Sequence, residues 1–256
     1  MKQKTTLILV CLLFGHCSMA QTERIFYSGY ERLIKLNDTG VTFAVDANND
    51  YPDCNSSITT QDCHFGRDAT HNDDSDGVAG FSFTKLDASG APLLDQSVDY
   101  ATDPWTCVRD NVTGLIWEVK IDSGSENPPD WGPHDPRQSW PSPDPLIQHA
   151  NDNDFCSMNN WREPSYQELL SMVDFSKMFG PFDPAYFPHQ PSVLYPNNQF
   201  RFRTSTKHTI DVGYPVIWQL LFNYQGTGGI GDDRLSYFAA TNENLFLRLV
   251  HSPLEQ

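Results

Sequence analysis

The acidic stretch from Asn72 to Gly77 has the residue types and spacing that best fit a chemical role. Oxygen-bearing side chains stand at its first, third and fifth positions, namely Asn72, Asp74 and Asp76, and Gly77 follows at the sixth. This is the first half of a calcium-binding loop, in which alternating ligands surround a hard cation. The twelfth position is Phe83 and not the bidentate glutamate of a complete loop. We therefore expect either bound calcium or a solvated, Asx-rich turn.

A second candidate ligand site is basic and consists of Arg201, Arg203, Lys207 and His208. Gathered on one surface, these cations would form a local basic patch, and charged donors form strong hydrogen bonds with anionic oxygens. The alternative is that they line the solvated edge of a strand.

Motifs for catalysis are weak in this chain. Residues 226–231 fit the pattern Gly-x-Gly-x-x-Gly, but Asp232 and Asp233 follow directly and would repel phosphate, and no helical period begins there. Neither Gly-x-Ser-x-Gly nor His-Glu-x-x-His occurs. We expect no enzyme and no cofactor other than calcium. Glycoside hydrolysis stays an alternative, because the 33 acidic residues include many chance pairs.

The first twenty residues predict export. Lys2 and Lys4 precede an apolar run at 7–14, and small residues at Ser18 and Ala20 suit cleavage by a signal peptidase. We expect residues 1–20 to be a signal peptide and the protein to reach the periplasm, the cell surface or the medium. No later stretch approaches the roughly 18 apolar residues of a membrane helix.

The remaining chain is strongly acidic. Two of the 17 Lys+Arg and none of the 33 Asp+Glu lie in residues 1–20, so the charge after cleavage is 15 − 33 = −18. Such a chain repels nucleic acid and anionic membrane surfaces. The sequence gives no indication of an oligomeric state.

Four cysteines remain after cleavage, at positions 54, 63, 107 and 156. An even number in an exported chain predicts two disulfides, and three pairings are open. We favour Cys54 with Cys63 and Cys107 with Cys156, because each pair lies within one coherent segment. Zinc is the rival, but no Cys-x-x-Cys occurs and no histidine follows a cysteine at three to five positions.

Composition changes near residue 100, so we expect a β-rich region at 21–102 and a second domain at 103–252. In the first region, the alternating residues 81–86 predict a half-buried strand, and residues 87–90 predict a hairpin turn with Gly90 at positive φ.

The second region opens with two predicted strands, 105–109 and 115–120, joined by a turn. Residues 122–145 are rich in Pro, Gly, Ser and Asp and predict a long exposed loop. A short helix is expected at 146–151 with Asp144 as its N-cap.

A better-marked helix follows Ser165, because Ser165 and Glu168 match a capping box. Its apolar face is expected to be part of the core and consists of Tyr166, Leu169, Leu170 and Val173. Further strands are predicted at 216–222, 235–240 and 245–250.

Several of these motifs resemble the Lcl C-terminal domain family, named for a collagen-like adhesin of Legionella. The early matches are Asp110, Thr113-Gly114-Leu115 and Trp117. The later matches are Trp161-Arg162 with Pro164, Glu168-Leu169 and Arg248-Leu249-Val250. The family's Trp-Ser-Ser is replaced by Arg203-Thr204-Ser205-Thr206, and its last arginine by His251.

This resemblance implies an α+β domain of the C-type-lectin-like or sulfatase-modifying-factor-like kind, preceded by a small β-rich segment that contains a disulfide. It also implies an exported, non-catalytic binding module that recognises a polysaccharide or another surface ligand. Some members of the family adhere to sulfated polysaccharide, for which the basic patch at 201–208 would have to meet the sulfate groups. The alternative is a structural or envelope protein that contacts other proteins and takes no small ligand.

Overall fold

The computed structural model describes residues 37–45, 50–51, 54, 61–70, 74–125, 127, 130–177, 182–190, 200–207, 216–222, 237–240 and 244–252. The chain divides into two units, residues 1–34 and 35–256, and every described residue belongs to the second. The predicted signal peptide and residues 226–231 lie outside the described residues. Within the described part, no helix combines the length and the apolar character needed to cross a membrane.

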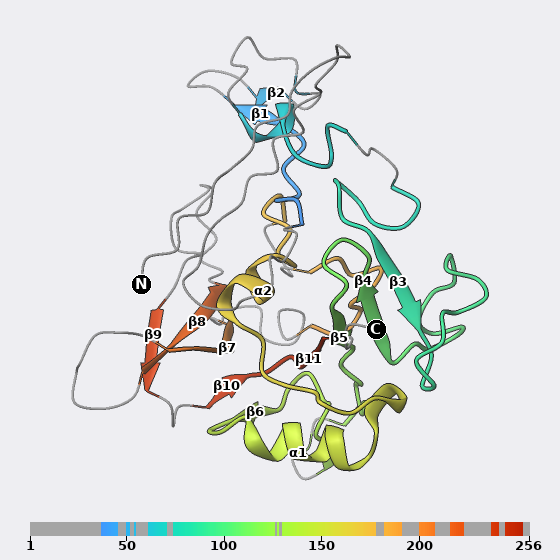
Figure 1. Ribbon diagram of the computed structural model, residues 1–256, viewed down its shortest axis with the longest axis vertical. Helices are drawn as coiled ribbons and strands as arrows, with labels where there is room; N and C mark the ends of the chain where they lie inside the picture. Colours follow the sequence, from blue (N-terminus) through green and yellow to red (C-terminus); the bar gives the residue numbers. More distant parts are fainter. Residues whose placement is uncertain are drawn as a thin grey trace, which may run out of the picture. The chain divides into compact units, whose positions relative to one another are not determined.

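One antiparallel sheet has four strands in the order β11-β5-β4-β3 (Figure 1). Its members are β3 (Phe83–Leu86), β4 (Cys107–Asp110), β5 (Ile116–Glu118) and β11 (Val250–His251). The strands predicted at 81–86, 105–109 and 115–120 are therefore confirmed. The β4–β5 turn is stabilised by Asp110, whose Oδ1 accepts hydrogen bonds from the amides of Val112 and Thr113.

The turn after β3 is confirmed, but the hairpin is reduced to a single bridge between Leu86 and Pro92. Gly90 has φ +79°, a conformation that favours glycine. Beyond the turn, the Gln96 side chain takes the place of a partner strand. Its Oε1 accepts from the Lys85 amide at 2.7 Å, and its Nε2 donates to the Lys85 carbonyl at 3.1 Å.

A second sheet has five strands in the order β6-β10-β7-β8-β9. Only the β10–β7 pair is parallel. The strands are β6 (Ser139–Trp140), β7 (Phe200–Lys207), β8 (Val216–Phe222), β9 (Tyr237–Ala240) and β10 (Leu245–Phe246). A separate two-stranded ladder pairs β1 (Ala44–Val45) with β2 (Asp50–Tyr51).

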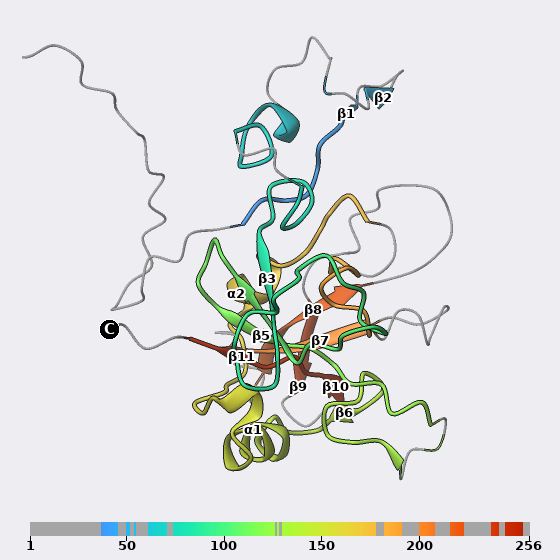
Figure 2. The same cartoon turned by 90° about the vertical axis from the view of Figure 1, so that its right-hand side faces the viewer.

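The prediction of one strand at 245–250 is wrong. The segment forms β10 in the five-stranded sheet and β11 beside β5, and residues 247–249 carry the chain from one sheet to the other (Figures 1 and 2). The reason is that Leu249 is bound by β5: its carbonyl accepts from the Glu118 amide, and its amide donates to the Glu118 side chain.

The helices are short. They are η1 (Asp62–His64), α1 (Asp144–Asp152), η3 (Phe155–Ser157) and α2 (Tyr166–Leu170). With the sheets, they confirm an α+β fold. Helix α1 begins at Asp144 and has Pro143 as its N-cap, so the predicted cap is displaced by one residue.

The predicted capping box of α2 is confirmed. Ser165 Oγ accepts from the Glu168 amide at 3.2 Å, and Glu168 Oε2 accepts from the Ser165 amide at 2.7 Å. Arg162 holds the same carboxylate through two hydrogen bonds of 2.8 and 2.6 Å. Of the expected apolar face, Leu169 and Val173 are fully buried.

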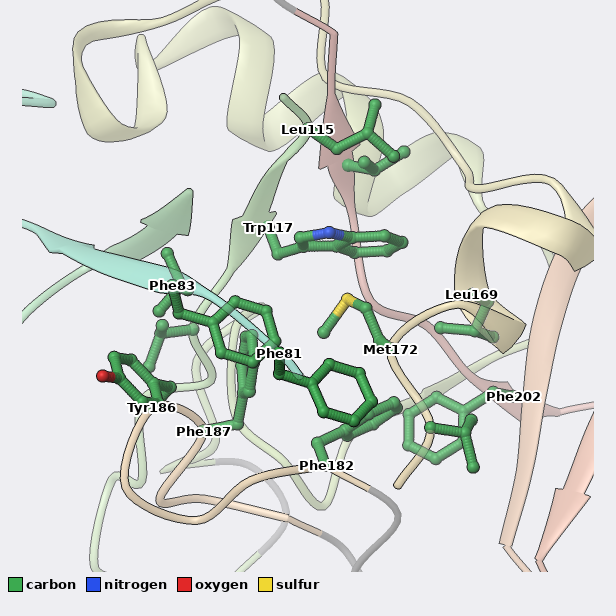
Figure 3. Close-up of a cluster of buried hydrophobic side chains, with 14 of the residues drawn as sticks. Phe81, Phe83, Leu115, Trp117, Leu169, Met172, Phe182, Tyr186, Phe187 and Phe202 are labelled. Carbon is green, nitrogen blue, oxygen red and sulfur yellow. The ribbon is translucent and has the colours of Figure 1, made fainter. Parts of the chain in front are cut away.

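Two hydrophobic clusters form the core of the described region. Figure 3 shows part of the first, in which the Trp117 ring lies between Leu115 and Met172 and aromatic rings gather below. The second cluster packs α1 and Trp161 against the other face of the four-stranded sheet and contains Cys107 and Cys156. Both predicted disulfides are present: Cys54–Cys63 closes a sequence separation of 9, and Cys107–Cys156 one of 49.

Candidate functional site

A buried group of charged side chains lies at the end of β5. Glu118 is fully buried, and its Oε1 is 2.7 Å from Lys120 Nζ and 2.7 Å from His134 Nδ1. Its Oε2 accepts from the Leu249 amide at 2.7 Å. Burial alone would raise the pKa of Glu118, but Lys120 and His134 outweigh that effect and lower it to about 2. The carboxylate is thus held as an anion that joins three segments of the chain.

Arg248 adds a second buried cation. Its guanidinium lies 4.9 Å from the centres of both the Phe182 and the Phe187 ring, and Nη1 donates to the Glu118 carbonyl. Burial lowers the pKa of Arg248 to about 10. Within the described part of the chain, its Nε and Nη2 have no hydrogen-bond partner.

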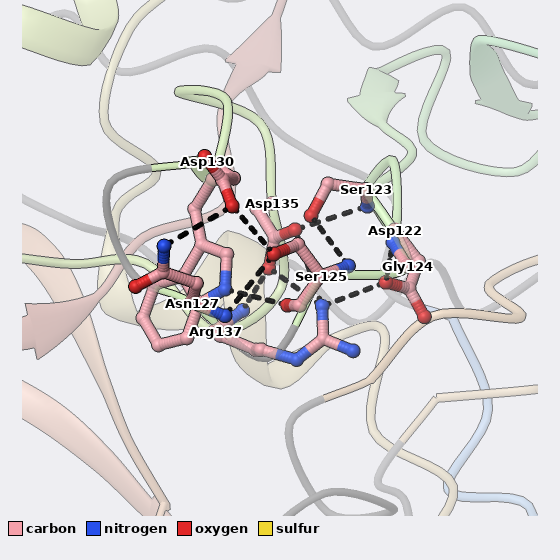
Figure 4. A network of polar contacts seen from close by, with 9 residues as sticks. Asp122, Ser123, Gly124, Ser125, Asn127, Asp130, Asp135 and Arg137 are labelled. Carbon is pink, nitrogen blue, oxygen red and sulfur yellow. Dashed lines mark hydrogen bonds and ion pairs between the residues drawn. The ribbon is translucent and has the colours of Figure 1, made fainter.

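Residues 121–138, here called the 121–138 loop, begin directly after Lys120 and include His134 of this buried group. Arg137 Nη1 donates to Asp122 Oδ1 at 2.6 Å and reaches both Asp135 oxygens at 3.3 Å. The Ser123 amide donates to Asp135 Oδ2 at 3.1 Å, so Arg137 and Asp135 tie the two arms of the loop together (Figure 4). The amide of Ile121 donates to the His134 carbonyl at 3.0 Å and closes the base.

The prediction of a long exposed loop at 122–145 is therefore only partly right. His134, Asp135 and Arg137 are all less than 8% exposed. They are buried because they supply the hydrogen-bond and ion-pair partners of Glu118 and Asp122. Composition does not reveal such contacts between distant residues.

The outer part of the loop has its own hydrogen bonds. Trp131 Nε1 donates to the Ser125 carbonyl at 2.8 Å. Asp130 Oδ2 accepts from Ser125 Oγ at 3.0 Å and from Asn127 Nδ2 at 3.2 Å (Figure 4). Asp130 and Asn127 are exposed and Trp131 is half-buried, so polar groups and one indole are held at the surface.

Two further aromatic side chains, Tyr100 and His189, contact each other. The His189 ring meets the Tyr100 ring edge to face, with centres 4.7 Å apart. Burial lowers the pKa of His189, and the charges of Asp122 and Asp135 act in the opposite direction.

The candidate calcium ligands fall in a different part of the structure. Asp74 is exposed, and its Oδ1 accepts from the Ala79 amide at 3.2 Å. Asp76 Oδ2 accepts from Ser82 Oγ, next to β3. Asn72 lies outside the described residues. Calcium at this loop stays a prediction.

The basic cluster is divided. Arg201 and Lys207 are exposed on β7, which is an inner strand of its sheet, and His208 lies outside the described residues. Arg203 is only 5% exposed, and its Nε lies 2.9 Å from Glu163 Oε1. Burial raises the pKa of Glu163 to about 7, while Arg203 acts against that rise. Arg203 is thus part of the interior, and sulfate binding by Arg201 and Lys207 stays a prediction.

Sequence reasoning missed Glu118, Lys120, His134 and Arg248 as a group. One signal was present: Glu118 interrupts the apolar run Leu-Ile-Trp-Glu-Val, and a charge inside a buried strand requires partners. The identity of those partners depends on the tertiary fold.

The arrangement of the 121–138 loop suits recognition. Its exposed carboxylate and amide groups can accept and donate hydrogen bonds, and the half-buried Trp131 offers an apolar ring face. The buried carboxylates Asp135 and Glu118 are already engaged with cations, which assigns them to the support of the loop.

The model of the Lcl C-terminal domain matches residues 106–251, which is more than half of the 256-residue chain. No curated protein and no solved structure gives a significant match. The matched segment contains β4, β5, both helices α1 and α2, the five-stranded sheet and the 121–138 loop. The chain therefore belongs to the Lcl C-terminal domain family.

Proposed function

We propose that this chain is an exported, non-catalytic binding module that recognises a polysaccharide or another surface ligand with its 121–138 loop. Membership of the Lcl family favours a surface-associated or exported protein. The observation that carries the proposal is the loop's construction, because an irregular loop of this length is fixed by the Arg137 contacts to Asp122 and Asp135.

Long loops without regular secondary structure are usually functional or disordered. Here side-chain bonds join the described residues of the two arms, 122–125 and 130–137, before any ligand arrives. Preorganisation reduces the conformational entropy that is lost on binding, so weak individual contacts with a ligand can add up to a useful affinity.

The chemistry of the surface favours a polyhydroxylated ligand. Asp130 and Asn127 can exchange hydrogen bonds with hydroxyl groups, and the apolar face of a sugar ring can stack on Trp131. A C-type-lectin-like arrangement, in which a rigid mixed domain supports long ligand-facing loops, belongs to the same proposal.

The exposed charge on the loop makes the ligand class more specific. Asp122 and Asp130 are carboxylates at the surface, and the chain as a whole has a formal charge of −16. Neutral or amino-substituted polysaccharides therefore fit this surface better than sulfated ones.

A panel of immobilised neutral, amino and sulfated polysaccharides tests the proposal. We expect saturable binding to a neutral or amino member, weakened about tenfold or more by Trp131→Ala because an aromatic anchor is lost. Trp131→Phe retains the ring and should restore much of the affinity. Leu94→Ala, a change at a fully exposed side chain, is the matched control.

The paired substitution Arg201→Ala with Lys207→Ala separates the two candidate surfaces. If it abolishes binding while Trp131→Ala has no effect, the site lies on β7 and not on the loop. A folded protein that binds no polysaccharide on the panel would contradict the proposed function.

The second candidate is a structural or envelope protein that contacts other proteins. Among the described residues, Phe65, Leu94 and Ile121 are large apolar side chains that are exposed and that a partner protein could cover. Chemical crosslinking in envelope fractions should then trap one defined partner, and Leu94→Asp with Ile121→Asp should abolish that crosslink. Removing this partner protein should leave polysaccharide binding unchanged.

A further inference from the structure

Three potential metal ligands meet in the N-terminal part of the described chain. One ligand atom from each of Cys54, Cys63 and His64 lies within 4.8 Å of the other two. Cys63 and His64 are neighbours on η1, while Cys54 reaches them across a separation of nine residues. No other group of three or more His, Cys, Asp or Glu side chains in the described part of the chain is close enough to hold a metal ion.

The histidine shows an independent sign of an unused ligand position. His64 Nε2 is buried from solvent, and among the described residues it has no hydrogen-bond partner. Buried polar atoms are almost always paired, so an unpaired nitrogen on the histidine that lies close to the two sulfurs requires an explanation. An imidazole nitrogen and two thiolates form a ligand set suited to zinc, whose fourth position water can fill.

The surroundings favour a cation. Asp62 is the first residue of η1, and its carboxylate accepts a hydrogen bond from the Thr39 hydroxyl. Asp62 directly precedes Cys63, so its negative charge acts in favour of a cation held at these residues.

We propose that Cys54, Cys63 and His64 form a redox-gated zinc site. In the oxidised protein the two sulfurs are joined as a disulfide and bind no metal. A dithiol reductant supplies two electrons and two protons, so the S–S bond breaks, two thiols form and the reductant becomes a disulfide. Zinc then binds the two sulfurs and the His64 nitrogen, and the two thiol protons are released to solvent.

The second disulfide is a natural internal contrast. Cys107 is fully buried and Cys156 is 3% exposed, whereas Cys54 is only half-buried. A mild dithiol should therefore reduce Cys54–Cys63 first, because attack on a disulfide requires access to sulfur. Alkylation followed by mass spectrometry identifies the opened pair.

The experiment uses cobalt(II) as a spectroscopic probe for zinc in the full chain. After selective reduction, one cobalt ion per chain should bind with thiolate-to-metal charge-transfer bands, and zinc should displace it. The oxidised protein should show no such bands. His64→Gln should weaken cobalt binding at least about tenfold, while His149→Gln, a change at an exposed histidine, should have no effect.

A second variant avoids the reduction step. Cys54→His cannot form this disulfide, and histidine tolerates the left-handed conformation of residue 54, where φ is 57°. It leaves two imidazoles and Cys63, so it should bind cobalt without reductant. The proposal is overturned if the reduced protein and this variant both stay folded and bind no cobalt, or if His64→Gln binds as tightly as the parent.

Discussion

The two disulfides stabilise regions of opposite character. Cys107–Cys156 joins β4 to η3 inside the second hydrophobic cluster, and its sulfurs are surrounded by packed apolar side chains. Cys54–Cys63 lies beside η1, and neither of its cysteines belongs to either cluster. The first disulfide therefore reinforces a packed core. The second stabilises a polar segment, and its cysteines lie outside both clusters.

The charged side chains of these two regions differ in a similar way. Glu118 is the strand partner of Cys107, so the buried charged group is built onto the cystine-containing sheet. In the N-terminal segment, the exposed Asp62 and the half-buried Asp68 instead accept hydrogen bonds from the Thr39 hydroxyl and the Ala69 amide. A rigid base thus supports the 121–138 loop, whereas the N-terminal segment depends on local bonds.

The largest effect is expected from Glu118→Ala. It leaves Lys120 and Arg248 buried without their anion, which should lower the free energy of unfolding by about 3–5 kcal/mol. Asp99→Ala, at an exposed turn, is the control and should change it by less than about 1 kcal/mol. Urea denaturation of both variants measures the difference. Equal, small effects would show that the buried group does not stabilise the fold.

The paired serine variants compare the disulfides directly. In the chain-entropy model, loss of Cys107–Cys156 should lower the free energy of unfolding by about 4 kcal/mol and loss of Cys54–Cys63 by about 3 kcal/mol. The difference between these two losses should be larger in practice, because serine hydroxyls at positions 107 and 156 would be buried among apolar groups. Denaturant titrations under oxidising conditions give both values. A larger effect at Cys54–Cys63 would reverse the comparison.

Acid should weaken the core region through Glu118. The pKa of Glu118 is about 2 in the folded protein, below the roughly 4.3 of an unfolded glutamate. A depressed pKa stabilises the fold above the unfolded value, so roughly 3 kcal/mol should be lost as the pH falls from about 5 to 1, through the folded pKa. Glu118→Gln should flatten this part of the stability profile. If the pH-stability profile of Glu118→Gln is identical to that of the parent protein, Glu118 is not the group whose protonation weakens the fold.

The smallest effect concerns the cap of α2. Ser165→Ala removes the acceptor for the Glu168 amide and should lower the free energy of unfolding by about 1 kcal/mol. Ser97→Ala, at an exposed residue, serves as its control. Thermal unfolding followed by circular dichroism can resolve this change, and equal melting temperatures for the two variants would mean that the capping box adds little.

Local patterns predicted much of the fold. The capping box of Ser165, the β4–β5 hairpin and the pairing of the cysteines all depend on short-range spacing or on segment coherence. Each is confirmed by the structure. The α+β class and the Lcl family followed from the same motifs.

The candidate site could not be predicted in the same way. Glu118, His134 and Arg248 are separated by many residues and meet only when residues 247–249 cross between the sheets. The apolar run at 245–250 looked like one strand because sequence period does not show a change of sheet. His64 was overlooked as a metal ligand because its position directly after Cys63 fits no common zinc motif.

Amide hydrogen exchange across the 121–138 loop tests the central claim most directly, because the account requires the loop to be ordered without ligand. The amides of Ser123 and Arg137, which donate to Asp135, should exchange at least about 100-fold more slowly than in an unfolded chain. Arg137→Leu should remove this protection while β4 and β5 stay protected. Exchange of both amides at unfolded rates in the parent protein would contradict the account.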